Sequence, residues 1–201
     1  MDNRINEFIL KEVENSIATK QKLLADKKLI DGIEEAANVC LKAYQRGGKV
    51  ILAGNGGSAA DAQHIAAEFV NQLNYDRPAL SSIALTTDTS ILTAIGNDRG
   101  YDEIFSRQIL ANGKAGDVFI GISTSGNSKN VIDAFKVCRK QNITTIGWTG
   151  ETGGEMKQYC DYCLCVPSSE TPRIQESHIL IGHIICGIIE DTLLKNNAKA
   201  N

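Results

Sequence analysis

The most informative stretch of the sequence is GDVFIGISTSGNSKNV, Gly116–Val131, which passes from an apolar run through a polar loop into a predicted helix. A short continuous apolar run such as Val118–Ile122 is typical of a strand that is covered on both faces of a parallel sheet. The loop STSGNS, Ser123–Ser128, then ends the strand and opens the helix. This order of strand, loop and helix indicates a β-α-β unit, in which successive strands lie parallel.

The same alternation extends on both sides of this stretch. We predict strands at Lys49–Ala53, Ser81–Leu85, Asp117–Ile122, Thr144–Trp148 and Tyr162–Val166, with helices after Gly57 and at Ser90–Ile95, Asp102–Ala111, Ser128–Gln141 and Arg173 to about Lys195. The pattern predicts an α/β fold, a three-layer sandwich around a mostly parallel five-stranded sheet. Ligands of such sheets bind beyond the carboxyl ends of the strands, so the loops at those ends are the candidates for a site.

The first 46 residues carry a different pattern. Apolar residues recur at i, i+3 and i+4 over Ile5–Ile17 and over Ile33–Tyr44, which predicts two helices joined around Asp26–Leu29. Gly47–Gly48 would end the second helix. We therefore divide the chain into N-terminal helices that pack on the core (1–46), one α/β domain (47–195) and a frayed tail (196–201).

Composition sets limits on function. With 201 residues, 42% of them apolar and 22% charged, the chain fits one globular domain better than a disordered or fibrous protein. A net charge of −3 gives no footprint for nucleic acid or an anionic membrane, so local groups would have to hold any anionic ligand. The sequence shows no signal peptide and no apolar run of membrane-spanning length, and we expect a cytoplasmic protein.

Six cysteines are scattered along the chain, at positions 40, 138, 160, 163, 165 and 186. Cys160 and Cys163 form a CxxC motif, which raises the question of a redox or metal site. A zinc site would need a second pair at suitable spacing, and a thioredoxin-like motif would open a helix, whereas this segment reads as a short strand. We expect reduced, buried thiols instead.

The loop STSGNS has the composition of a phosphate site. Hydroxyl groups and backbone N–H groups at a helix N-terminus favour an anion, because the helix dipole and the unpaired donors both attract negative charge. Gly126 would let the backbone bend around a phosphate. The loop lacks the GK[ST] ending of a nucleotide P-loop. The alternative is that Ser128 merely caps the helix, which would leave the other hydroxyls without a role, so we favour phosphate.

The predicted first strand ends in a second tight turn, GNGGSA at Gly54–Ala59. The turn fits the dinucleotide fingerprint GxGxxA. The acidic residue of that fingerprint should close the second strand, whereas Asp76, at about the right spacing, precedes that strand. A turn that brings backbone N–H groups and Asn55 to a sugar phosphate is the better explanation.

The loop after the second strand, TTDTS at Thr86–Ser90, is also polar. Capping of the helix that follows accounts for Asp88 and Ser90, because short side-chain oxygens accept from the free N–H groups of a first helical turn. Asn97 and Asp98, further along, look like a plain turn when the residues are considered alone.

The histidines form the second candidate group. His64 and Glu68 are spaced i, i+4 on a predicted helix and project from one face. Gln175 and His183 lie about 80° apart around the last helix and can face one cleft. Together they suit zinc or a similar divalent cation. Singly, the first two would be an ordinary surface pair and His183 a core histidine, and we assign His178 a structural role.

Aldose–ketose isomerisation is a chemistry that these residues can support. The reaction needs a base that moves a proton between adjacent carbons through an enediol, and an acid that handles the oxygens. Glu68 and His183 can supply both. The residues alone therefore indicate a phosphate-binding parallel α/β fold with a Glu/His pair.

Four ordered blocks resemble the sedoheptulose 7-phosphate isomerase (phosphoheptose isomerase) family of SIS-domain proteins. They are GNGGSAADAQHIAAEF (Gly54–Phe69), ALTTDTSILTAIGND (Ala84–Asp98), GDVFIGISTSGNSKNV (Gly116–Val131) and RIQESHILIGHIIC (Arg173–Cys186). The resemblance implies a flavodoxin-like SIS fold and conversion of sedoheptulose 7-phosphate to D-glycero-D-manno-heptose 7-phosphate, the first step towards the heptose of lipopolysaccharide or capsule. It also implies a homotetramer with shared sites, in which the N-terminal helices contact neighbouring subunits.

The resemblance also assigns residues to roles. Phosphate would be held by Ser123, Thr124, Ser125 and Ser128, and the rest of the substrate would contact Asn55, Gly56, Gly57, Glu68, Asn97, Asp98 and Gln175. Zinc would be bound by His64, Glu68, Gln175 and His183, with Glu68 and His183 as the acid–base pair. Ligation and proton transfer compete for the same lone pairs, and the sequence leaves both roles open.

One departure and three rival functions remain. Gln72 stands where many members carry an arginine, which puts one substrate or intersubunit contact in doubt. The rivals are a non-catalytic SIS protein of the replication-initiation adaptor type, an isomerase of another sugar phosphate, and a sugar-phosphate-sensing regulator. Retention of Glu68, Gln175 and His183 argues against the first, and the lack of a DNA-binding module argues against the last.

Overall fold

The computed structural model describes residues 3–200, with side chains from Arg4 to Leu193, and alternates strands with helices after residue 49. In order the elements are α1 (Asn3–Ala25), α2 (Lys27–Gln45), β1 (Val50–Gly54), α3 (Gly57–Val70), β2 (Ser82–Ala84), α4 (Thr89–Arg99), the 3₁₀ helix η1 (Tyr101–Glu103), α5 (Ser106–Asn112), β3 (Val118–Ile122), α6 (Lys129–Lys140), β4 (Thr144–Thr149), the 3₁₀ helix η2 (Glu155–Gln158), β5 (Tyr162–Cys165) and α7 (Thr171–Ala200). The tail predicted to fray, 196–201, belongs to α7 as far as Ala200, and Asn201 lies outside the described residues.

The sheet has the five strands that were predicted, and all of them are parallel. Their order is β2-β1-β3-β4-β5. β2 lies on one side of β1, and β3, β4 and β5 follow one another on the other side. The order therefore reverses between β1 and β3, which is where open parallel sheets bind ligands. Gly54 pairs with Ile122 in the register of these two strands, so the turn after β1 and the loop after β3 begin side by side.

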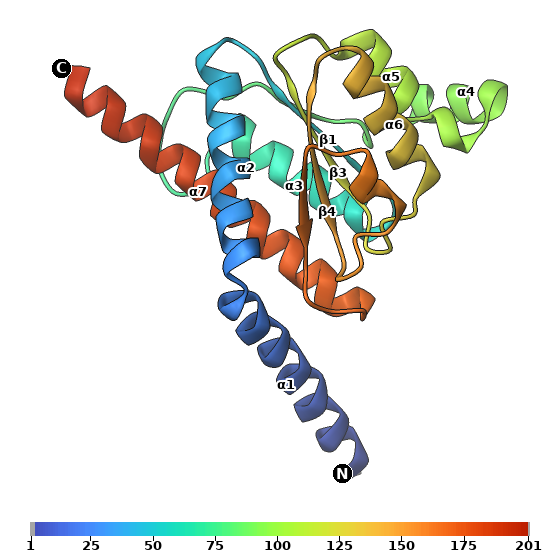
Figure 1. The fold of residues 1–201 in the computed structure, drawn as a ribbon, viewed down its shortest axis with the longest axis vertical. Helices are drawn as coiled ribbons and strands as arrows, with labels where there is room; N and C mark the ends of the chain where they lie inside the picture. Colours follow the sequence, from blue (N-terminus) through green and yellow to red (C-terminus); the bar gives the residue numbers. More distant parts are fainter. Residues whose placement is uncertain (1–2, 201) are drawn as a thin grey trace.

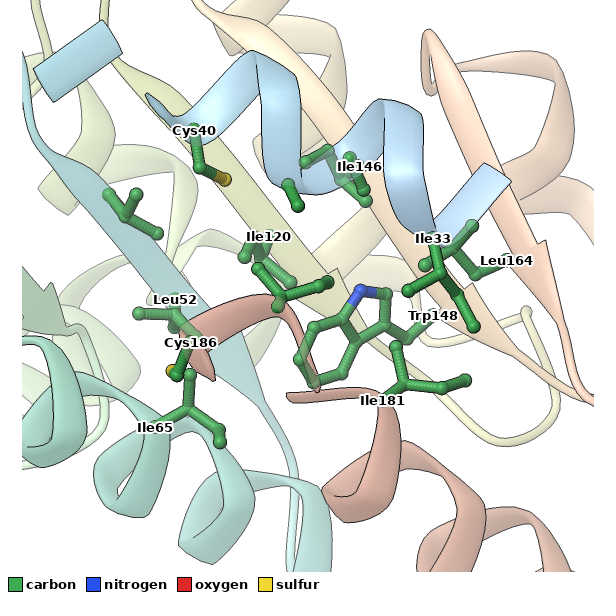
Figure 2. Packing of buried hydrophobic residues seen from close by; sticks show 14 of the residues in the cluster. Ile33, Cys40, Leu52, Ile65, Ile120, Ile146, Trp148, Leu164, Ile181 and Cys186 are labelled. Carbon is green, nitrogen blue, oxygen red and sulfur yellow. The ribbon is translucent and has the colours of Figure 1, made fainter. Parts of the chain in front are cut away.

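Two layers of helices cover the sheet (Figure 1). One face packs against α2, α3 and α7 around Trp148, and Figure 2 shows Ile33 of α2, Ile65 of α3 and Ile181 of α7 converging on it. The other face packs against α5 and α6, with Phe119 and Phe135 edge to face. All residues of β1 and β3 are buried, because a strand covered on both faces exposes neither side-chain row. The predicted three-layer sandwich is confirmed.

Helix α1 extends away from the body of the protein (Figure 1). A single residue separates it from α2, where the side chain of Asp26 accepts the N–H of Leu29 at 3.0 Å and caps the second helix. Contacts with α7 hold its middle, including an ion pair between Arg173 and Glu12. Seven large apolar side chains of α1 are each more than half exposed: Ile5, Phe8, Ile9, Leu10, Val13, Ile17 and Leu24.

The region after β2 differs most from the prediction. Asp88 caps α4 as expected, with Oδ1 accepting the N–H of Ile91 at 2.9 Å. The helix continues to Arg99, so Asn97 and Asp98 lie in its last turn and the prediction of a plain turn is wrong. Gly100 follows with φ +93°, a conformation that ends the helix at little steric cost. No helix within residues 3–200 is both long and apolar enough to cross a membrane.

Candidate active site at the β1–β3 edge

The hydroxyl groups of the loop after β3 face one another. Ser128 occupies the N-cap position of α6, yet its side chain makes no capping hydrogen bond. Its Oγ lies 2.9 Å from Oγ of Ser123, which in turn lies 3.5 Å from Oγ of Ser125. The capping alternative is therefore wrong for Ser128. Three hydroxyls gather beside the positive end of a twelve-residue helix, the arrangement expected of an anion site.

Gly126 fixes the path of this loop. Its φ is +70°, and a Cβ on it would collide with the carbonyl group of Gly153. The carbonyl oxygen of Gly126 accepts the N–H of Met156 at 2.9 Å. The loop after β3 is thus packed directly on the loop after β4, and Gly126 serves this packing as well as the bend that the sequence predicted.

A pair of amides ties the turn after β1 to the start of α6. Asn55 and Asn130 exchange two hydrogen bonds of 2.9 Å, one in each direction. Tyr101 of η1 donates its hydroxyl to Oδ1 of Asn55 at 3.1 Å. Asn55 was a predicted site residue, whereas Asn130 and Tyr101 were not. Asn130 is a polar residue in the first turn of α6, directly after the loop, and this position is the signal that could have revealed it. The structure shows that the residue is buried.

The same turn receives Gln175 from α7. Gly56 adopts φ +55°, and a Cβ on Gly57 would come within 2.6 Å of Nε2 of Gln175. The amide of Gln175 therefore lies directly against the start of α3. A larger residue at position 57 would displace the Gln175 amide from this contact, so the glycine leaves room for α3 and α7 to meet at the edge of the sheet where the two loops begin.

Two turns further along α3, the predicted His/Glu group assembles. Nε2 of His64 lies 2.8 Å from Nε2 of His183 and 3.3 Å from Oε1 of Glu68. One donor atom from each of the three residues can be chosen so that all lie within 4.8 Å of one another. The structure thus brings together three of the four predicted metal ligands, and it places Gln175 against Gly57.

A buried ion pair holds the end of α3 that carries Glu68. Arg77 donates to the carbonyl oxygen of Glu68 at 2.7 Å and to the carboxylate of Glu190, on α7, at 2.9 Å. Burial alone would raise the pKa of Glu190, but the N–H groups of Leu73 and Asn74 together with Arg77 hold that pKa below its usual range. No local sequence pattern predicts this pair, because its members are 113 residues apart.

His178 has the structural role that was predicted. It is fully buried, and its Nε2 lies 3.2 Å from the carbonyl oxygen of Thr149 at the end of β4. Burial lowers its pKa to about 4, so the ring is neutral near pH 7. His178 secures α7 to the sheet between Gln175 and His183.

Two predicted substrate contacts lie elsewhere. Asn97 and Asp98 are exposed on α4, and their side chains hydrogen-bond to each other at 2.8 Å. Among the described residues, neither side chain contacts the serine loop or the His64–Glu68–His183 cluster. Gln72, the departure from the family pattern, is exposed just beyond the end of α3.

Comparisons with known proteins identify the family of the chain. The model of the SIS domain matches residues 14–150. The chain is 58% identical to phosphoheptose isomerase from Aneurinibacillus thermoaerophilus, over 96% of this chain and 97% of that protein. It is 58% identical to phosphoheptose isomerase 2 from Campylobacter jejuni, over 96% of each. The structure of phosphoheptose isomerase from Neisseria gonorrhoeae superposes with a TM-score of 0.87 at 45% identity, covering 93% of this chain and 99% of that one. The chain therefore belongs to the SIS-domain family and, within it, to the phosphoheptose isomerases.

Proposed function

We propose that this protein is an aldose–ketose isomerase that converts sedoheptulose 7-phosphate to D-glycero-D-manno-heptose 7-phosphate. The observation that carries the proposal is that helix α3, which bears His64 and Glu68 of the His64–Glu68–His183 cluster, begins at the turn after β1, beside the serine loop after β3. Relatives that are 58% identical over nearly their full length bear the corresponding name.

The serine loop is proposed to hold the phosphate. With a net charge of −3, the chain has no broad positive field to attract an anion, so the binding must be local. The hydroxyls of Ser123, Thr124, Ser125 and Ser128 would donate to phosphate oxygens, and the first N–H groups of α6 point the same way. Hydrogen bonds to a charged group are worth about 1.5–3 kcal/mol each, which suffices without a lysine or arginine.

The spacing along α3 suits a long sugar. Asn55 and Asn130 hold the start of α3 beside the start of α6. His64 lies seven residues beyond Gly57 on α3, a rise of about 10 Å. A seven-carbon chain with a terminal phosphate extends over roughly this length, since each carbon–carbon bond is about 1.5 Å long. In the proposed pose the phosphate would occupy the serine loop, and C1 and C2 would lie towards the cluster.

Proton transfer is assigned to Glu68 and His183. The Glu68 carboxylate would take the proton from C1 of the ketose, giving the enediol, and return it to C2 of the aldose. His183 would move the proton between the oxygens on the same two carbons. The Arg77–Glu68 backbone contact fixes the helical turn that carries the carboxylate, which keeps the base in one position through both transfers.

The cluster also fits a zinc ion. His nitrogens and a carboxylate oxygen are the donors that zinc prefers, and here they converge from two helices. Zinc would be held by His64, Glu68, Gln175 and His183, and when bound it would act as a Lewis acid on the sugar oxygens. A carboxylate has two oxygens, so Glu68 can face the cluster with one and accept a proton with the other.

A panel of ketose phosphates with five, six and seven carbons, assayed with and without a chelator, tests the proposal. We expect turnover to be highest with sedoheptulose 7-phosphate, to fall in the chelator and to return when zinc is added. Lack of any preference for seven carbons would overturn the proposed substrate. Activity that is indifferent to the chelator would overturn the zinc.

We also propose that the protein is a homotetramer with shared sites. The apolar face of α1 and helix α4, in which no residue is buried, both need a cover, and Asp98 would then reach the site of a neighbouring subunit. Sedimentation tests the assembly: Phe8→Glu should give smaller species than the wild type, whereas Lys11→Glu, the same substitution on another exposed residue of α1, should not. A wild type that sediments as a single chain would contradict the proposal.

The proposed location is the cytoplasm, where the product would feed the synthesis of heptose nucleotides for lipopolysaccharide or capsule. This part rests on the family alone. Deletion of the gene should remove heptose from the surface glycans, and the wild-type gene should restore it, whereas Glu68→Gln should not. Surface heptose that persists without the gene would contradict this role.

A further inference from the structure

Asn130 joins the two loops of the candidate site from an enclosed position. It lies in the first turn of α6 and is 3% exposed. Its amide pairs with that of Asn55, through two hydrogen bonds of 2.9 Å that run in opposite directions. Asn55 is only partly buried, so a ligand can reach it. The pair therefore connects a residue that has no assigned role to a predicted substrate contact.

The backbone fixes which way the amide of Asn130 faces. Its Oδ1 accepts the backbone N–H of Val131 at 2.9 Å. An N–H group needs an acceptor, and the NH₂ group of an amide offers donors only. If the oxygen and nitrogen of Asn130 exchanged places, two donors would face each other in a buried position, which costs free energy. The orientation of this amide therefore follows from its bond to the backbone.

Asn130 passes this orientation on to Asn55. Its NH₂ group needs an oxygen opposite it and its Oδ1 can take an N–H, so Asn55 presents Oδ1 to the first and Nδ2 to the second. The hydroxyl of Tyr101 donates to the same Oδ1 of Asn55 at 3.1 Å. Since a carbonyl oxygen has two lone pairs, both acceptor positions of Asn55 are then occupied.

One hydrogen of the Asn55 amide is left for a ligand. In a reciprocal amide pair each NH₂ group donates the hydrogen on the side of its own oxygen, so the other hydrogen points away from the partner amide. Towards a ligand, Asn55 is thus a donor and not an acceptor. The oxygens of a sugar phosphate are the matching partners, because phosphate, carbonyl and hydroxyl oxygens all accept hydrogen bonds.

We infer that Asn130 is a positioning residue, which holds the amide of Asn55 so that it donates to an oxygen of the sugar phosphate. The inference rests on the proposed function, in which Asn55 contacts the substrate. The last torsion of a free asparagine side chain is broad and roughly two-fold. Without Asn130, the amide of Asn55 could turn its oxygen towards the ligand, and two oxygens that face each other repel. Pairing with Asn130 removes this unproductive orientation before the ligand arrives.

The strand register places this donor at the right edge of the sheet. Asn55 follows Gly54, which pairs with Ile122 at the end of β3. Asn130 lies two residues beyond Ser128 of the serine loop. The amide of Asn55 is therefore held beside the segment proposed to bind the phosphate, where open parallel sheets receive their ligands.

A double-mutant cycle on ligand binding tests the inference. The probe is D-glucitol 6-phosphate, a polyol phosphate that has no carbonyl group and cannot isomerise, and calorimetry measures its Kd. We expect Asn55→Ala and Asn130→Ala each to raise Kd about tenfold in the full-length protein, as the loss of one hydrogen bond to a charged group does. The double variant should bind as Asn55→Ala does, because Asn130 acts through Asn55.

Controls separate positioning from folding. In Asn130→Ala the N–H of Val131 keeps the carbonyl oxygen of Ser128 as an acceptor, at 3.1 Å, and circular dichroism checks that each variant is folded. If Asn130→Ala does not fold, Asn130→Ser takes its place, since its side chain is polar but too short to reach the partner amide. Asn112→Ala removes an amide that bonds to the carbonyl oxygen of Gln108 on its own helix, and it should leave Kd unchanged.

Three results would overturn the inference. The first is a double variant in which the two losses multiply, to about a hundredfold, since independent sites add in free energy. The second is either single variant that binds as tightly as the wild type, and the third is a wild type that does not bind the probe. Turnover of sedoheptulose 7-phosphate tests the proposed function separately, because a protein that shows the expected coupling without isomerising the sugar would refute the function alone.

Discussion

The serine loop after β3 and the helix α4 were both predicted to contact substrate, but they differ in how far the structure buries them. In the loop, Ser123 is 4% exposed and Gly126 is fitted against Gly153. In α4, none of the eleven residues is buried, and Asn97 and Asp98 hydrogen-bond to each other. The loop is enclosed by its own chain, whereas α4 lies on the surface and reaches the core through the partly buried side chains of Leu92 and Ile95.

This difference shows which of the predicted substrate contacts a single chain can position and which would need a neighbouring subunit. A group contributes to binding or catalysis only where the fold holds it close to the reacting atoms. The serine loop meets this condition within a single chain. Helix α4 does not, so its predicted role requires another subunit, in line with the proposed tetramer with shared sites.

Mixing two inactive variants gives the largest expected effect. Glu68→Gln and Asp98→Asn each disable every site of their own homotetramer, by removing the base or the neighbour's contact. If Asp98 serves the neighbouring subunit, random mixed tetramers should regain about a quarter of the sites. The measurement is isomerase activity after the two proteins are unfolded and refolded together. Activity no higher than that of the separate variants would mean that α4 serves its own chain.

Two glycine substitutions, one in each region, should change the free energy of unfolding in opposite directions. Gly126→Ala places a Cβ against the carbonyl of Gly153 at φ +70°, and we expect the free energy of unfolding to fall by about 2–4 kcal/mol. Gly96→Ala lies within α4, where nothing is within 4 Å, and should raise it by about 0.5–1 kcal/mol. Urea denaturation measures both. Equal losses would show that the loop is no more constrained than the helix.

Acid should lower the free energy of unfolding because His178, which holds α7 against the sheet, is buried in its neutral form. Its pKa is lowered by burial from 6.5 to about 4 in the folded protein. The unfolded chain therefore binds the proton first, so stability is lost as the pH falls from about 6.5 towards 4, by up to about 3 kcal/mol. Unfolding measured across this range should show a shallower pH dependence in His178→Gln than in the wild type. Identical slopes would contradict the assignment.

The smallest expected effect compares single hydroxyls. Ser128→Ala removes a proposed donor to the phosphate and should raise KM about tenfold with little change in kcat, because one hydrogen bond to a charged group is worth about 1.5 kcal/mol. Thr93→Ala, on α4, removes a hydroxyl that bonds to its own helix and should leave KM unchanged. Initial rates with the heptulose phosphate distinguish the two variants. A fall in kcat without a change in KM in Ser128→Ala would contradict the proposed contact between Ser128 and the phosphate.

The α/β part of the fold was predictable because each signal was local. Val118–Ile122 is an apolar run that ends in a polar loop and a helix, and the same order recurs along the chain. Parallel strands bring the ends of β1 and β3 together, so Asn55 and Ser123 could be placed at one edge without coordinates. His64 and Glu68 followed from helical spacing alone.

The rest depended on contacts between distant segments. Arg77 and Glu190 are 113 residues apart, and no local pattern joins them. Ile5–Ile17 has helical apolar periodicity, as Ile33–Tyr44 does, yet the first face is exposed and the second is buried. Periodicity shows that a helix has an apolar face but not which chain covers it.

The most direct test of the central claim is the conversion of sedoheptulose 7-phosphate by the wild type, Glu68→Gln and His183→Gln, each fully folded. Removing a positioned base or acid should lower kcat by about 10²–10⁴-fold, with a smaller change in KM because the serine loop is intact. The account predicts conversion by the wild type and this loss in both variants. Equal activity in all three proteins would contradict it.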